Sequence, residues 1–342
     1  MPELKRAQVL PTHSAALFEA AVLRACELLK QGEVVGLPTE TVYGLAANAL
    51  DPKGVSRIYE IKGRPAHNPI IVHVSSFELA RDCANEWPAT AEKLGRAFWP
   101  GPLTLVLRRA ESIPDIVTAG GDTVGIRWPS HPFIQAVIGR CGFPLAAPSA
   151  NPANRLSPTT AEHVWKYFGD RLKLIVDGGQ SHVGIESTVV DLSECPPRLL
   201  RPGMIHEQAL LAVTEELVLG SGENQQILKS PGQLLHHYSP RAKLLVRSWS
   251  DEEELRQQLR RTETRTLPEK THIIAHTKVP SGEALGQISI IPHDPEAFAR
   301  GIYAALHECD EAGAELIVVE ELPDTTEWRA IRDRLNRAAA DG

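Results

Sequence analysis

Residues 33–45 read EVVGLPTETVYGL, an apolar run followed at once by a cluster of polar side chains. The apolar run over Glu33–Pro38 predicts a short buried strand. The hydroxyl groups of Thr39 and Thr41 then stand at the end of that strand, where open α/β sheets bind their ligands. The alternative interpretation is a capped turn from a strand into a helix, because Thr and Glu are also frequent at helix N-termini.

The sequence around this stretch alternates between strand and helix patterns at irregular intervals. Apolar residues recur at helical spacing over Leu17–Leu29, and β-branched residues fill Ile70–Val74. Further strands are predicted at Leu103–Leu107, Val124–Arg127, Leu172–Val176 and Thr188–Leu192, and further helices at Pro52–Ile61, His131–Gly139 and Thr160–Phe168. This pattern predicts an α/β fold with a mixed sheet and helices packed on it, rather than a regular parallel crossover fold.

The second part of the chain follows a polar segment. A short helix pattern at Glu207–Leu217 gives way to polar, Gly-bearing sequence that is typical of a linker. Strand patterns then occur at 243–247, 271–276, 287–291 and 315–319, and helix patterns at 251–261, 294–308 and 325–339. We therefore predict a domain over residues 1–206, a linker over 207–240 and a small three-layer α/β domain over 241–342.

Composition excludes several classes of protein. The 342 residues are 42% hydrophobic and 23% charged, as in soluble globular proteins, so a disordered or fibrous chain is excluded. No uncharged apolar run reaches the roughly 18–20 residues of a membrane-spanning helix, and the first residues lack the apolar segment of a secretion signal. A cytoplasmic location is therefore expected. The five cysteines form no CxxC pair, which indicates reduced thiols rather than a zinc cluster or disulfide framework.

Charge is distributed unevenly along the chain. The net charge is −7, from 36 Lys and Arg against 43 Asp and Glu. Residues 1–203 hold 21 basic and 20 acidic residues, a net charge of +1, and the remainder holds 15 and 23, a net charge of −8. A globally acidic chain without a basic run is a poor candidate for tight nucleic-acid binding. An anionic small substrate fits the first part better.

Three basic positions are candidates for anion recognition. Lys62 and Arg64 flank a glycine on one short loop, where Arg can fork onto a phosphate and Lys adds a point charge; a solvated basic turn is the alternative. Arg127 ends an apolar strand, and a buried Arg needs either a substrate anion or an internal ion pair. His73 lies inside an apolar strand, where a hydrogen-bonded core histidine is the alternative to a ligand contact.

Small and polar residues form further candidate loops. AAPSAN at 146–151 leaves space beside Ser149 and Asn151, and SPT at 157–159 precedes a helix whose free N–H groups suit an anion; a turn with an N-cap is the alternative. No GxxxxGK[ST], GxGxxG, HExxH or GxSxG motif occurs, so a bound nucleotide needs a different phosphate cradle. The adjacent His236 and His237 have no Cys or carboxylate partner at fixed spacing, and no protein metal site is predicted.

Taken in order, these motifs resemble one family closely. PTETVYGL, KGRP, NPIIVHV, WPGPLT, APSAN, SPT, DGG, ESTVVD and LLRPG resemble the YrdC-like domain. The SPG…HHYSP linker and the acidic tail resemble the long, two-domain form of that family, the L-threonylcarbamoyladenylate synthases. The resemblance implies a YrdC-like mixed twisted sheet followed by a smaller Rossmann-like α/β domain.

The resemblance also implies an activity. It is the synthesis of threonylcarbamoyl-AMP and pyrophosphate from L-threonine, bicarbonate or carbon dioxide, and ATP, with Mg²⁺ on the nucleotide phosphates. The product would be handed to a tRNA threonylcarbamoyl transferase complex for modification of tRNA. No covalent protein nucleophile is needed, which agrees with the missing nucleophile motifs.

Site residues follow from the same resemblance. The L-threonine pocket is expected to be lined by Thr41, His73, Arg127, Ala147 and Ser187, with Arg127 on the substrate carboxylate. ATP is expected to be held by Arg64, Thr123, Ser149, Asn151, Ser157, Arg201 and Tyr238. Lys62 and Arg64 are expected to act on the triphosphate.

One departure concerns the linker. The family often carries Met-Lys-Tyr before the linker histidine, and this chain has Gln233-Leu234-Leu235, so Leu235 replaces a tyrosine that approaches the nucleotide. The retained Tyr238 is expected to compensate in part. We expect the linker to cross the active site and exclude water from the hydrolysable carbamate and mixed anhydride. The second domain is expected to cover and regulate that site rather than add an activity.

Two other functions are open to the same sequence. One is a carbamoyl transfer enzyme with a YrdC-like domain, but such enzymes carry an acylphosphatase-like segment and zinc-finger CxxC pairs that this chain lacks. The other is a non-catalytic RNA-binding module, which the charge balance disfavours.

Overall fold

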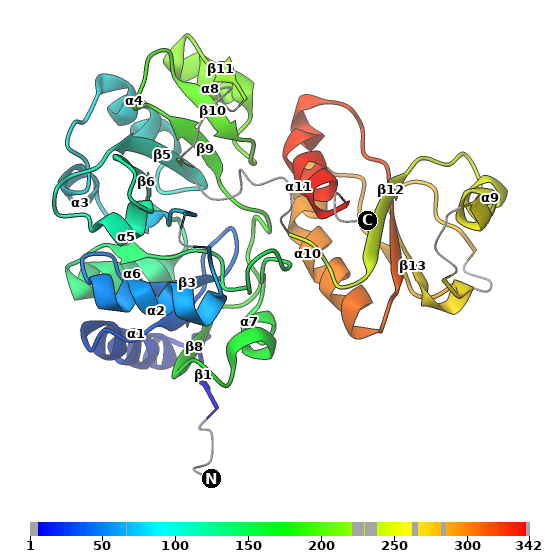
Figure 1. The fold of residues 1–342 in the computed structure, drawn as a ribbon, viewed down its shortest axis with the longest axis horizontal. Helices are drawn as coiled ribbons and strands as arrows, with labels where there is room; N and C mark the ends of the chain where they lie inside the picture. The colour runs from blue at the N-terminus through cyan, green and yellow to red at the C-terminus, as the bar shows by residue number, and fades with distance from the viewer. Residues whose placement is uncertain are drawn as a thin grey trace. The chain divides into compact units, whose positions relative to one another are not determined.

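The computed structural model of the chain describes residues 6–65, 67–220, 229, 238–261, 266–281 and 285–339. The chain divides into two compact units (Figure 1). The first comprises Met1–Ala153 with Ser157–Leu234, and the second comprises Leu235–Gly342 with the short segment Asn154–Leu156.

The first unit is built on a mixed sheet of eleven strands, in the order β1-β8-β2-β3-β7-β4-β6-β5-β9-β10-β11. It contains parallel pairs such as β4–β6 and antiparallel pairs such as β5–β6, which confirms the predicted mixed sheet. The strands are β1 Gln8–Pro11, β2 Val35–Leu37, β3 Gly44–Asn48, β4 Val72–His73, β5 Leu103–Arg108, β6 Thr123–Arg127, β7 Leu145–Ala146, β8 Leu174–Asp177, β9 Thr188–Asp191, β10 Arg198–Arg201 and β11 Val218–Leu219.

Helices cover both faces of this sheet. They are α1 Ala15–Lys30, α2 Pro52–Lys62, α3 Phe77–Asp82, α4 Ala89–Phe98, α5 Asp115–Thr118, α6 Pro132–Cys141, α7 Ala161–Phe168 and α8 Glu207–Thr214. Successive side chains of a strand point to opposite faces of the sheet, so the core has two parts, one on each face. Leu174 and Val176 pack with α1 and α6, whereas Ile175 between them belongs to the core that includes residues of α2, α4 and α7.

The PTETVYGL segment joins two antiparallel strands. It lies between β2 and β3, which pair with Val35 opposite Ala46 and Leu37 opposite Gly44. The alternative of a strand-to-helix turn is therefore wrong. Tyr43 fastens the segment to the loop after β8, because its hydroxyl donates to Gly179 O (2.6 Å) and accepts from Gly178 N (3.1 Å). The aromatic ring is fully buried, and burial raises the pKa of its phenol.

The first unit extends further along the chain than predicted. Helix α8 packs onto it, since Leu210 is fully buried in the core that also contains Leu94 of α4. Lys229 also belongs to it, because its ammonium group lies 2.9 Å from the buried carboxylate of Asp191. The predicted linker start at residue 207 is thus corrected to a point beyond α8. Residues 221–228 and 230–237 of the predicted linker, with Leu235 and the adjacent histidines, lie outside the described residues.

The second unit has a parallel sheet of four strands in the order β12-β15-β13-β14. The strands are β12 Lys243–Arg247, β13 Thr271–Ala275, β14 Ile288–Ile290 and β15 Leu316–Glu320. The helices are α9 Glu252–Arg261, α10 Pro295–Glu311 and α11 Arg329–Ala339, with short 3-10 turns at Pro268–Lys270 and Thr326–Trp328. This arrangement, drawn from yellow to red in Figure 1, confirms the Rossmann-like α/β prediction.

Candidate active site

Strand pairing places Arg127 among three polar side chains. Arg127 ends β6, opposite His73 of β4 on one side and Thr104 of β5 on the other. Side chains that are directly opposite in neighbouring strands lie on the same face of the sheet, so these three residues form one row. All three are buried. The hydroxyl of Thr104 lies 2.8 Å from that of Ser187, which extends the row to the residue before β9.

The guanidinium of Arg127 contacts the PTETVYGL segment. Its Nη1 donates to Thr41 Oγ1 at 2.8 Å, and its Nε donates to Gly101 O at 3.4 Å. Its Nη2 lies 2.7 Å from Glu40 Oε1 in an ion pair that lacks the geometry of a hydrogen bond. Arg127 thus has an internal ion pair, one of the two predicted alternatives, while part of its hydrogen-bonding capacity stays unused.

His73 is buried beside the positive charge of Arg127. It is 3% exposed, and its Nδ1 has no hydrogen-bond partner among the described residues. Burial and, to a lesser extent, the positive charge of Arg127 together lower the pKa of His73 to about 3. The imidazole is therefore neutral near pH 7 and offers uncharged polar contacts.

This pKa makes stability depend on pH. Between pH 6.5 and about 3 the unfolded chain binds a proton at His73 that the folded protein does not bind, so the free energy of unfolding falls as pH falls. At pH 5 the loss from this group is about 2 kcal/mol. We expect His73→Gln to lack that part of the loss when denaturation is measured at pH 7.5 and 5. His13→Gln, at an exposed histidine, should lose stability as the wild type does; equal losses in all three proteins would contradict the assignment.

The end of α2 places Lys62 beside the APSAN loop. Helix α2 ends at Lys62, and the C-cap residue Gly63 has a left-handed φ of 62°, which suits glycine. The ammonium group of Lys62 donates to Ser149 O (2.8 Å), Asn151 O (2.5 Å) and Asn151 Oδ1 (2.9 Å). Three acceptors use its three hydrogens. Burial and the charge of Arg64 hold the pKa of Lys62 well below its usual value. Lys62 therefore holds two candidate nucleotide loops together.

Arg64 braces the loop that follows α2. It is 8% exposed, and it donates to Asn68 O (2.9 Å), Asn68 Oδ1 (2.7 Å) and Pro69 O (2.5 Å). The guanidinium thus fixes the Asn-Pro segment that leads into β4. Lys62 and Arg64 are side by side, as predicted, and both are bound to protein oxygens.

Ser187 connects the Arg127 row to Arg201. Arg201 donates from Nε to Ser187 O (3.0 Å) and from Nη2 to Ser187 Oγ (3.1 Å). The neighbouring Glu186 accepts a hydrogen bond from the hydroxyl of Ser157 at 2.6 Å, and its charge also acts on Lys62. The two predicted groups of site residues therefore meet at residues 186–187.

The remaining predicted residues fall into three places. Ala147 lies beside β4, where its backbone N–H donates to Ile71 O (3.1 Å). Thr123 begins β6, four residues before Arg127 and paired with Arg108, so it lies about 13 Å from the Arg127 row. Tyr238 is in the second unit, 1% exposed, with its ring 6.1 Å from that of Tyr303. Its burial there gives no support for a nucleotide contact.

Sequence reasoning assigned no role to three of the residues found here. Glu40, Thr104 and Glu186 all contact predicted site residues. Glu40 and Glu186 stand inside the quoted motifs, where two acidic residues in otherwise hydroxyl-rich loops are the signal that could have found them. Thr104 has no such signal, because only strand register brings it opposite Arg127.

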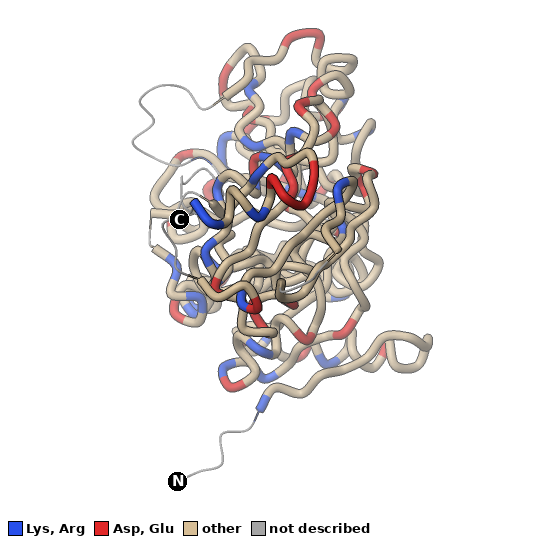
Figure 2. The backbone as a smooth tube through the Cα atoms, turned by 90° about the vertical axis from the view of Figure 1, so that its right-hand side faces the viewer, with Lys and Arg blue, Asp and Glu red and all other residues tan. Residues whose placement is uncertain are grey.

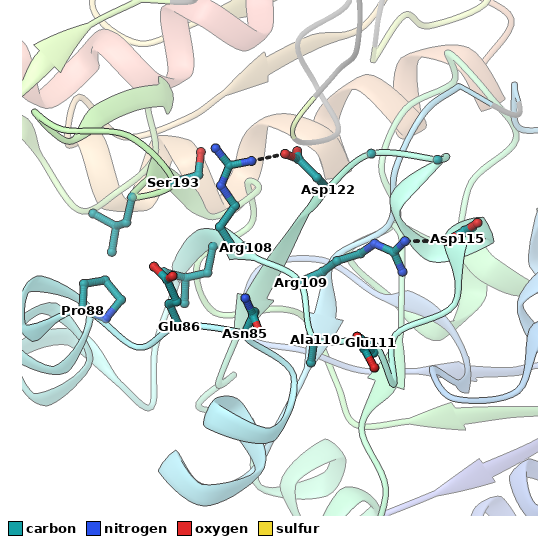
Figure 3. A pocket seen from close by; sticks show the side chains of 14 residues that line it. Asn85, Glu86, Pro88, Arg108, Arg109, Ala110, Glu111, Asp115, Asp122 and Ser193 are labelled. Atoms are coloured by element: carbon teal, nitrogen blue, oxygen red, sulfur yellow. Dashed lines mark hydrogen bonds and ion pairs between the residues drawn. The ribbon is translucent and has the colours of Figure 1, made fainter.

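A hollow of about 710 Å³ lies at the opposite end of β5 and β6. Arg108, Arg109, Asp115 and Asp122 are among the side chains that line it (Figure 3). Arg108 pairs with Asp122, and Arg109 with Asp115 at 2.5 Å. The carboxylates of both pairs are exposed to water, which screens the charges, whereas Arg127 is buried among polar side chains. The row around Arg127 is therefore the stronger candidate for anion recognition.

Comparison with known proteins agrees with this site. Residues 27–203 match the family model described as Telomere recombination, and residues 202–340 match the one described as Threonylcarbamoyl-AMP synthase, C-terminal domain. The threonylcarbamoyl-AMP synthase of Bacillus subtilis is 40% identical over 344 residues, covering 98% of this chain and 97% of that protein. This chain belongs to the threonylcarbamoyl-AMP synthase family. It is therefore an ATP-using enzyme of the nucleotidyl-transfer type.

Relatives of this family extend over both units. The threonylcarbamoyl-AMP synthase of Pyrococcus abyssi is 39% identical over 328 residues, covering 92% of this chain and 93% of that protein. The crystal structure of P. abyssi Sua5 complexed with L-threonine superposes with a TM-score of 0.88 at 35% identity, over 97% of this chain and 98% of that one. Both relatives therefore match this chain across its two units.

Two further features concern hydrophobic helices and the distribution of charge. Among the described residues, no helix is both long and apolar enough to cross a membrane. Lys and Arg are interspersed with Asp and Glu along the described backbone (Figure 2).

Proposed function

We propose that the first unit makes threonylcarbamoyl-AMP with L-threonine bound at the Arg127 row and ATP bound along the loops of Lys62, Arg64 and Ser149. The observation that carries this proposal is the environment of Arg127. Its guanidinium is buried, stands in a row of polar side chains, and keeps unused hydrogen-bonding capacity. A substrate carboxylate would use that capacity with charge-assisted hydrogen bonds.

The chemistry needs positioning rather than a protein nucleophile. The α-ammonium group of L-threonine must lose a proton before its nitrogen can form a carbamate, and a carbamate oxygen must then align with the α-phosphorus of ATP. Thr41, in the turn between β2 and β3, and the neutral His73 of β4 would orient the substrate. Ser187 would join the two substrates because it contacts both Thr104 and Arg201. Arg64 and Arg201 would stabilise the charge that develops on the leaving pyrophosphate.

Mg²⁺ fits the residues near the proposed phosphate region. Ser157 and Glu186 offer a hydroxyl and a carboxylate oxygen, the hard donors that Mg²⁺ prefers. Magnesium held chiefly by the nucleotide phosphates would neutralise part of their charge. We further propose that the product passes to a tRNA threonylcarbamoyl transferase complex, since a mixed anhydride survives only briefly in water.

The direct test combines the protein with ATP, magnesium, L-threonine and labelled bicarbonate. Labelled threonylcarbamoyl-AMP and pyrophosphate should form together, and both should disappear when L-threonine is omitted. Equal release of pyrophosphate with and without L-threonine, and no labelled adenylate, would overturn the proposal. Omitting magnesium in a parallel reaction tests the metal, and an unchanged rate would remove it from the proposal.

A further inference from the structure

We infer that Glu40 binds the α-amino group of L-threonine and so makes the site specific for an amino acid. The inference rests on the proposed function, because it places the substrate carboxylate on Arg127. It assigns a role to a residue that sequence motifs alone left without one.

Glu40 is a buried carboxylate with unused acceptors. It is 4% exposed. Its Oε1 lies 2.7 Å from Arg127 Nη2 in an ion pair without hydrogen-bond geometry, and its Oε2 has no hydrogen-bond partner within the part of the chain that the structure describes. Leaving such a group unsatisfied is costly, and native proteins rarely do so without a reason. Donors brought by a ligand would satisfy it.

The backbone holds Glu40 in this place. Its carbonyl oxygen accepts from Val183 N at 2.7 Å. On either side, Thr39 Oγ1 donates to Val42 O at 2.6 Å, and Thr41 Oγ1 accepts from Arg127. The carboxylate is therefore fixed next to Arg127 by the turn between β2 and β3, not by a flexible loop.

The charges around Glu40 match an amino acid zwitterion. The Glu40 carboxylate and the Arg127 guanidinium stand 2.7 Å apart but without an aligned hydrogen bond. The α-carboxylate and α-ammonium of an amino acid are likewise adjacent and opposite in charge. One ligand can thus pair its carboxylate with Arg127 and its amino group with Glu40. His73 lies beside Arg127, and His131 is close enough for the charges of Glu40 and His182 to act on it. Burial lowers the pKa of His73 and of His131 below the usual value.

A competing role for Glu40 is to position Arg127 without touching the substrate. The two roles differ in one measurable respect. If Glu40 only positions Arg127, its loss weakens every ligand that has a carboxylate. If Glu40 binds the amino group, its loss weakens only ligands that carry that group.

The experiment compares L-threonine with its 2-hydroxy analogue, in which a hydroxyl replaces the α-amino group. Calorimetry measures both dissociation constants in wild type and in Glu40→Gln, which keeps size and removes charge. We expect the wild-type preference for L-threonine to shrink by about 10- to 100-fold in the variant, with the analogue's affinity changed by less than about threefold. Equal weakening of both ligands, or an unchanged preference, would overturn the inference.

Controls separate this inference from folding and from the proposed function. Asp191→Asn changes another buried carboxylate, one paired with Lys229 away from this site, and should keep the wild-type preference. If Glu40→Gln fails to fold, Glu40→Asp, which retains the charge, takes its place. Its preference for L-threonine over the analogue should lie between that of wild type and that of Glu40→Ala. A wild type that binds both ligands equally overturns the inference alone. A wild type that binds no L-threonine overturns the proposed function with it.

Discussion

Replacing Arg127 by alanine is expected to lower kcat/KM for L-threonine by about 30- to 1000-fold, because a buried substrate carboxylate would lose its charged partner. The affinity for ATP should change far less. The first quantity comes from adenylate formation as a function of L-threonine concentration, and the second from calorimetry with a non-hydrolysable ATP analogue. A variant that lost ATP affinity and kept normal L-threonine dependence would move Arg127 to the phosphate side.

The ion pair with Glu40 makes a second variant necessary. Alanine at position 127 leaves the buried Glu40 carboxylate without its counter-charge, which by itself destabilises a fold. Arg127→Lys keeps the charge and gives up the planar fork, so it should fold and still use L-threonine poorly. Extensive unfolding of both variants would show that Arg127 serves the internal ion pair instead of the substrate.

Replacing Lys62 by methionine is expected to slow adenylate formation by about 100-fold, while the affinity for L-threonine stays within about twofold of wild type. Lys62 is the link between α2 and the Ser149–Asn151 segment. Without it, the loops proposed to align the triphosphate lose their common anchor. Single-turnover adenylation and calorimetry with L-threonine alone measure the two effects.

A matched control is Lys173→Met. The Lys173 side chain is 57% exposed and lies 2.9 Å from Glu33 on the surface, where an ion pair contributes little. Its adenylation rate should equal that of wild type. A large loss of L-threonine affinity in Lys62→Met would contradict the separation of the two substrate regions.

Local patterns predicted most elements of both units, because helix and strand periods are properties of short stretches. Helix α1 begins at Ala15 after Ser14, whose hydroxyl accepts from Leu17 N (3.3 Å), close to the predicted start. The apolar run at 172–176 became β8 with both faces buried. Strands β1, β3, β7, β10 and β11 and helices α3, α4 and α5 were missed. Strands β7 and β11 have only two residues each, too few to show a period, and β1 depends on β8, more than 160 positions along the chain.

The ordered motifs also identified the family, because the segments that carry Thr41, Lys62 and Ser187 have sequence signatures of their own. In the structure, most of the predicted site residues lie in two neighbouring groups. The same turns left the direction of each side chain open. Whether Arg127 faced an ion pair or a substrate could not be read from a strand that simply ends in arginine.

Tertiary structure alone decided the contacts that give the site its electrostatics. Glu40 meets Arg127 across 87 positions of sequence, and Thr104 reaches Ser187 across 83. Contacts at such separation depend on strand order and register, which no single stretch of sequence encodes. Lys62 shows the same limit. A basic loop predicts a solvated or phosphate-binding cation, but packing buried this lysine and directed its three hydrogens to the backbone and side chain of another loop. The burial that lowers the pKa of His73 and of Lys62 arises only when the whole sheet and its helices exclude water.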